Sequence, residues 1–217
     1  MKGDVIVLEA HHVEAAATIV PHVLDTIASR PRRSVITVAG ESGSGKSETG
    51  KAIADELARH GQPAVLLGQD DYFRLPPRSN DAKRRDDPTW LGPHVEVRLD
   101  LLERHLVEAI DGADEIVKPL VDYDADAIDE ETIDLRNVRV VVAEGTYTSL
   151  LRHVDTRVFI ARNRLDTLEH RQKRNRGSEV GDPFIESILE TEHKIIAGHR
   201  QLADFVITRD DDVIVVP

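Results

Sequence analysis

The chain has 217 residues, a formal net charge of −12 and no cysteine, which fits one α/β domain and excludes disulfides, thiolate metal sites and cysteine nucleophiles. Its acidic balance disfavours nucleic acid and anionic membranes as partners but leaves phosphorylated small ligands open. The chain has neither an apolar run of about 18 residues nor a signal-peptide pattern at its start, so the sequence predicts a cytoplasmic protein without a membrane span.

The first 33 residues are expected to form a strand–helix extension packed on the core. Residues 5–8 are short and apolar, as in a strand, and residues 10–29 carry apolar side chains at helical spacing. Pro21 is expected to kink that helix or divide it in two. The run Arg-Pro-Arg-Arg at 30–33 then serves as a linker to the main domain, residues 34–217.

Strands and helices alternate along the main domain. Apolar, β-branched runs predict strands at 34–39, 64–67, 138–143, 157–161, 205–208 and 213–216. Helical patterns occur at 46–60, 98–110, 165–176 and 183–202, and the polar residues 69–87 suggest a long loop. This alternation predicts a mostly parallel sheet flanked by helices, with ligands bound beyond the carboxyl ends of its strands. Four polar residues that follow predicted strands should therefore converge on one crevice: Ser47, Asp70, Asp71 and Glu144.

A phosphate-binding loop follows the strand at 34–39. Its sequence, Gly40-Glu41-Ser42-Gly43-Ser44-Gly45-Lys46-Ser47, fits the pattern G-x-x-x-x-G-K-[ST] and leads into a helix with Glu48. Such a loop turns its backbone N–H groups toward phosphate oxygens at a helix N-terminus. Lys46 is expected to bind the β and γ phosphates and the Ser47 hydroxyl to bind Mg²⁺. The fold class is thus a P-loop NTPase-like α/β domain.

Two carboxylates are candidates for the chemistry. Glu144 ends the strand at 138–143 and is expected to hold Mg²⁺ directly or through water, with a surface acid in a turn as the alternative. Asp70 follows the strand at 64–67 and is expected to be the general base for an attacking hydroxyl, close to the γ-phosphate. A capping or turn role is the alternative for Asp70. Tyr72 and Phe73 are expected to pack.

Basic residues gather near the C-terminal third of this acidic chain. Arg171 and Arg174 share a helix face, and with Lys173 and Arg176 they could close over phosphates, in a small lid at about 164–182. The alternative is a solvated basic helix. The histidines, among them His12 and His193, show no metal-ligand spacing and are expected to lie on the surface or to pack.

The ordered set of motifs resembles the uridine kinase and phosphoribulokinase family of P-loop kinases over residues 34–208. Besides the phosphate loop, the resemblance rests on these segments: Gln69-Asp70-Asp71-Tyr72-Phe73, Asp87-Pro88, Lys118-Pro119 with Tyr123-Asp124, Val142-Ala143-Glu144-Gly145, and the arginines from 171 to 176. It implies MgATP-dependent phosphorylation of a hydroxyl, with Asp70 as base, Lys46 as phosphate clamp and Ser47 and Glu144 as metal ligands. Asp70 is also a candidate to contact the metal. The arginines at 171, 174 and 176 would form the lid.

The acceptor side departs from that family. Gly92 stands about where uridine kinases carry an acceptor-binding aspartate, and Ala125 to Ile128 replace an aromatic residue and a histidine. Uridine and cytidine are therefore expected to be poor acceptors.

These features predict a kinase that uses ATP and Mg²⁺ to phosphorylate a small hydroxyl-bearing metabolite: a nucleoside, a sugar or a related polyol. Two other classes stay open. One is a nucleotide-driven ATPase switch that acts on a protein partner, and the other is a metabolite sensor without turnover. A guanine-reading Asn/Thr-Lys-x-Asp element is absent, and the sequence leaves the oligomeric state open.

Overall fold

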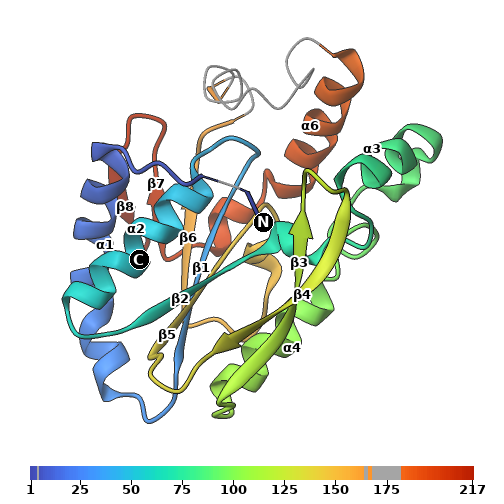
Figure 1. Cartoon of the computed structure of the whole chain (residues 1–217). Helices are drawn as coiled ribbons and strands as arrows, with labels where there is room; N and C mark the ends of the chain where they lie inside the picture. The colour runs from blue at the N-terminus through green and yellow to red at the C-terminus, as the bar shows by residue number, and fades with distance from the viewer. Residues whose placement is uncertain (4, 164–165, 168–181) are drawn as a thin grey trace.

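The computed structural model describes residues 1–3, 5–163, 166–167 and 182–217 (Figure 1). Its centre is a six-stranded sheet in the order β2-β5-β1-β6-β7-β8. The pairs from β2 to β7 are parallel, and β8 runs antiparallel to β7. The predicted α/β fold is confirmed. The strands are, in spatial order, β2 Ala64–Gly68, β5 Val140–Glu144, β1 Ser34–Gly40, β6 Thr156–Ile160, β7 Phe205–Ile207 and β8 Val213–Val215.

Helices cover both faces of this sheet. In Figure 1, α1 and α2 lie on one side, while α4 and a separate β hairpin lie on the other. The α-helices are α1 Ala10–Ser29, α2 Lys46–Arg59, α3 Pro77–Asp86, α4 Leu99–Ile110 and α6 Pro183–Ile196. The short 3-10 helices are η1 Gln69–Tyr72, η2 Pro88–Trp90, η3 Thr148–Leu150 and η4 His199–Leu202. None of the described helices is long and apolar enough to cross a bilayer.

The sheet has an apolar core on each of its faces, and the alternation of side chains along its strands explains both cores. In β1, Ile36 belongs to the apolar cluster that α1 and α2 complete, whereas Val35 belongs to the cluster beneath α4. Side chains of successive strand residues point to opposite faces, so a strand covered on both sides is apolar throughout. All seven residues of β1 are buried, as that arrangement requires.

Several expected elements differ in the structure. Residues 5–8 form no strand, and α1 continues through Pro21 as one helix. Residues 69–87 are mostly ordered as η1 and α3 rather than forming a long loop. The final helix ends at Ile196, and a 3-10 turn follows.

The hairpin of β3 (Glu115–Asp122) and β4 (Ala127–Asp134) was not expected from the sequence. Its eight-residue strands form their own two-stranded antiparallel sheet. Pro119 lies inside β3, and most of β4 is polar and exposed or half-buried. Proline and charge normally argue against a strand, but an edge position and one solvated face tolerate both.

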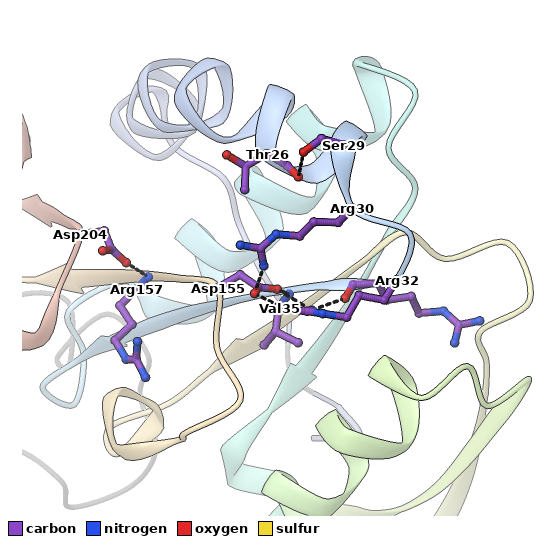
Figure 2. Close-up of polar contacts among 9 residues, drawn as sticks. Thr26, Ser29, Arg30, Arg32, Val35, Asp155, Arg157 and Asp204 are labelled. Atoms are coloured by element: carbon purple, nitrogen blue, oxygen red, sulfur yellow. Dashed lines mark hydrogen bonds and ion pairs between the residues drawn. The ribbon is translucent and has the colours of Figure 1, made fainter.

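The linker after α1 is tied to the sheet by a single carboxylate (Figure 2). Asp155, just before β6, accepts hydrogen bonds from the guanidinium groups of Arg30 and Arg32 and, at 2.9 Å, from the backbone N–H of Val35. Arg33 donates to four backbone carbonyls around α4 and β5. The basic linker is thus part of the packed structure.

Candidate active site

The loop between β1 and α2 has the geometry of a phosphate cradle. Gly43 and Gly45 have positive φ angles of 76° and 90°, which side chains rarely adopt. The Lys46 ammonium donates to the carbonyl oxygen of Glu41 at 2.9 Å, within the loop itself. Ser47 lies in the first turn of α2, whose N-terminus carries the positive end of the helix dipole. The loop therefore offers donors and positive potential to an anion.

The sheet order brings the candidate residues to this loop. Glu144 ends β5 and lies in register with Val38 of β1 on one side and with Gly68 of β2 on the other. Asp70 follows Gly68 directly in η1. A cavity of about 140 Å³ opens at these strand ends. Its lining is Ser42, Gly43, Lys46, Ser47, Gln69, Asp70, Phe73, Arg84, Glu144, Thr146, Tyr147 and Glu192. Lys46, Ser47, Asp70 and Glu144 are thus brought together.

Glu144 has the electrostatic setting of a cation ligand. Burial first, and then the nearby charge of Asp70, raise the pKa of its carboxyl to about 7, while Lys46 and a hydrogen bond with Ser47 oppose the shift. A divalent cation bound by Glu144 would offset the cost of burying its charged carboxylate. Within the described ranges no group of three or more metal-ligating side chains exists. The residues fit Mg²⁺, which commonly takes one or two carboxylates and completes its shell with phosphate oxygens and water.

Asp71 does not join this cavity, contrary to expectation. Its carboxylate accepts from the Lys118 ammonium at 2.7 Å and from the backbone N–H of Val121 at 3.0 Å, so it fastens η1 to the hairpin. It lines an adjoining cavity of about 410 Å³, which Ser47 and Glu144 also border. In a 3-10 turn, consecutive side chains point about 120° apart, which separates Asp71 from Asp70.

The rest of the cavity lining includes residues that sequence reasoning missed or, for Phe73, assigned to packing. Arg84 of α3 donates to Glu96 at 2.7 Å, and its guanidinium lies 3.9 Å from Glu192 of α6. Tyr147 is buried, and its hydroxyl has no hydrogen-bond partner among the described residues. No motif spacing connects these positions, because α3, α6 and the turn after β5 meet only in the fold.

Two histidines contact the phosphate loop from opposite ends of the chain. His12 of α1 is buried, and its Nε2 would lie 2.9 Å from a Cβ at Gly45. His193 of α6 places Nδ1 2.5 Å from the Glu41 carboxylate. His12 packs in the interior and His193 stays half-exposed, within the surface-or-packing expectation for the histidines, but both contact the phosphate loop.

Other expected site residues lie elsewhere. Arg171, Arg174 and Arg176, and all of the expected lid except residues 166, 167 and 182, lie outside the described residues. Gly92 donates its N–H to Glu96 at 3.3 Å, and Ile128 lies in β4 opposite Val121. Neither is in the described lining of the cavity.

The chain resembles one protein family model, several curated proteins and several solved structures. The zeta toxin family model matches residues 21–117. A bifunctional α-galactosidase/sucrose kinase, AgaSK, from Mediterraneibacter gnavus is 29% identical over 83% of this chain, which spans only 20% of that protein. A uridine kinase from Bacillus cereus (strain B4264) is 28% identical over 80% of this chain and 84% of its own length. Among solved structures, a D-glycerate 3-kinase from Cryptococcus neoformans shares the fold, with a TM-score of 0.62 at 14% identity over 96% of this chain and all of that one.

Proposed function

We propose that this chain, a uridine kinase-like P-loop kinase by sequence relatives and fold, transfers the γ-phosphoryl group of ATP to a hydroxyl of a small metabolite such as a nucleoside, a sugar or a related polyol. The observation that carries the proposal is the cavity in which Lys46, Ser47, Asp70 and Glu144 meet. The names of the two curated relatives, a uridine kinase and a protein with sucrose kinase activity, support an acceptor of this class.

Each residue would have a defined task. The loop from Gly40 to Ser47 would hold the triphosphate through its N–H groups, and Lys46 would leave the Glu41 carbonyl to neutralise the β and γ phosphates. Ser47 and Glu144 would hold Mg²⁺, which when bound supplies neutralisation of phosphate charge. Asp70 would orient the acceptor hydroxyl and take its proton. Arg171, Arg174 and Arg176 would screen the transferring group.

This division of labour predicts different defects in two variants. Lys46→Ala should weaken MgATP binding and abolish measurable turnover, because it removes the cation for the phosphates. Asp70→Asn should bind MgATP nearly as tightly as the parent and turn over about 10²-fold or more slowly, because it loses the base. The measurements are isothermal titration with MgATP and ADP release in a screen of hydroxylated metabolites.

A matched control is Asp81→Asn, which changes a half-exposed aspartate on α3 that pairs with Arg85. It should behave like the parent in both assays. If the parent binds no MgATP, the proposed function fails. If Asp70→Asn keeps parental turnover, Asp70 is not the base, and another group must activate the hydroxyl.

A further inference from the structure

The part of the cavity lined by Arg84, Tyr147 and Glu192, hereafter the acceptor end, carries a charge pattern of its own. Arg84 is the cation of this region nearest to Glu192, and its side chain is only 15% exposed. Glu96, with a fully buried side chain, takes a hydrogen bond from Arg84 on one side, and Glu192 lies within ion-pair distance on the other. One guanidinium therefore faces two carboxylates.

The Arg84 guanidinium already pairs with Glu96 within a hydrogen-bonded network. Glu96 accepts hydrogen bonds from Arg84 and from the Asn80 amide at 3.0 Å, and Trp90 in turn donates to Asn80 at 2.7 Å. A buried network in which each member has a partner is costly to rearrange. If Arg84 turned to a phosphate of the acceptor, the buried Glu96 carboxylate would lose its cationic partner and keep only the neutral donors of Asn80 and Gly92.

The remaining groups suit hydroxyls. Glu192 lines the cavity, and burial raises its pKa to about 7, so near neutral pH its carboxyl can either accept or donate a hydrogen bond. The buried Tyr147 hydroxyl has no partner in the described structure and offers another donor and acceptor. Phe73 is less suited to stacking on a base, because the Arg84 guanidinium lies over its ring, 5.8 Å from the centroid.

We propose that the phosphoryl acceptor is an uncharged polyol, a free sugar or sugar alcohol, whose hydroxyls bind Glu192, Tyr147 and Arg84, and that Glu192 excludes phosphorylated and carboxylated acceptors. This inference rests on the proposed kinase function and specifies its acceptor. In its ionised form Glu192 discriminates by repulsion as well as by attraction, since an anion beside it would meet a like charge in a poorly solvated cavity.

The test compares neutral acceptors with their anionic counterparts in an ADP-release assay with the full chain and MgATP. Matched pairs are glucose with glucose 6-phosphate, ribose with ribose 5-phosphate, and glycerol with glycerate, and uridine is included as a nucleoside. The parent should have a higher kcat/KM for a neutral polyol than for any anionic counterpart. Glu192→Gln should lower kcat/KM for the neutral acceptor about tenfold or more, mainly through KM, because a hydrogen bond to a charged group is lost.

Glu192→Gln should also lower the ratio of kcat/KM for neutral acceptors to kcat/KM for their anionic counterparts. Mere loss of packing would not produce that change. Glu190→Gln is the matched control, since Glu190 is on the same helix but pairs with Lys194 with both side chains half-exposed or more. Glu190→Gln should leave unchanged both kcat/KM for the neutral acceptor and its ratio to kcat/KM for the anionic counterpart. KM for MgATP should stay at the parental value in both variants.

The outcomes separate the two proposals. Preference for a phosphorylated or carboxylated acceptor, or activity confined to uridine, overturns the polyol inference while the kinase function stands. Parental selectivity in Glu192→Gln overturns the role of Glu192. If MgATP binds but no acceptor of any class stimulates ADP release, the proposed function and the inference fail together.

Discussion

His12 shows how one buried side chain can connect protonation to the nucleotide loop. Its ring lies against Gly45, and within the described part of the chain its Nε2 has no hydrogen-bond partner. Burial, with a further contribution from the charge of His11, lowers its pKa to about 4. In the unfolded chain the same imidazole titrates near 6.5. The folded state therefore holds His12 neutral across this interval, while the unfolded state takes up a proton.

The sign of the pH effect follows. The unfolded state binds more protons between about pH 6.5 and 4, so the free energy of unfolding falls as the pH drops through that window and is unaffected by this group above it. His12→Gln should reduce this fall in the free energy of unfolding by at most about 3 kcal/mol over the window. Denaturant unfolding at several pH values measures it. The control is His22→Gln on the exposed side of α1, and equal slopes for parent and His12→Gln would contradict the assignment.

At the scale of elements, the turn after β5 positions both Glu144 and the first residue of η1. Gly145 has a φ of 155°, and a Cβ there would lie 2.2 Å from the Gln69 Cβ. Gln69 in turn accepts from the backbone N–H of Tyr147 at 2.7 Å. Because the two segments approach so closely, only glycine fits at position 145. The same close approach sets the distance between Glu144, the metal-ligand candidate, and Asp70, the base candidate.

Substitution should reveal that contact. Gly145→Ala should lower the free energy of unfolding by about 1–3 kcal/mol more than Gly112→Ala does, because Gly112 also has a positive φ, 98°, but has open space around it. Thermal or denaturant unfolding of the two variants separates steric conflict from backbone strain. Equal losses would mean that Gln69 moves aside freely. Gly145→Ala should also weaken MgATP-dependent turnover, since Glu144 and Asp70 lose their spacing.

Much of the element order could be predicted from the sequence because its signals are local. A G-x-x-x-x-G-K-[ST] motif between a β-branched run and an amphipathic run determines the strand, the loop and α2 together. The hairpin could not be predicted, because Pro119 and its charged residues mask the alternation. The acceptor end could not be predicted either, since Arg84, Glu192 and Tyr147 come together only through tertiary packing.

At the scale of the whole molecule, residues 1–33 and residues 34–217 share one core. Ile19 and Val23 of α1 are buried in the same cluster as Ile53 of α2 and Val142 of β5. Asp155 ties the connecting arginines to the sheet. We propose that residues 1–33 and 34–217 unfold as one cooperative unit rather than as separate parts.

Ile19→Ala tests this. The side chain is fully buried, so its truncation should cost about 2–5 kcal/mol. Far-UV circular dichroism and loss of MgATP binding should shift to the same new midpoint in denaturant. Thr18→Ala, exposed on the same helix, should stay within about 0.5 kcal/mol of the parent. A variant that loses part of its helical signal while its binding transition stays in place would show that α1 unfolds independently.

The contact between His193 and Glu41 has a consequence for protein synthesis. The two residues are 152 positions apart in sequence, and the nucleotide loop leaves the ribosome long before its α6 partner exists. At roughly 5–20 residues per second, the nascent chain carries that loop without this contact for on the order of ten seconds. The acceptor end of the site waits equally long, because Glu192 is the immediate neighbour of His193. Under the proposed function, the phosphate loop of a growing chain is thus synthesised well before the acceptor end of the site.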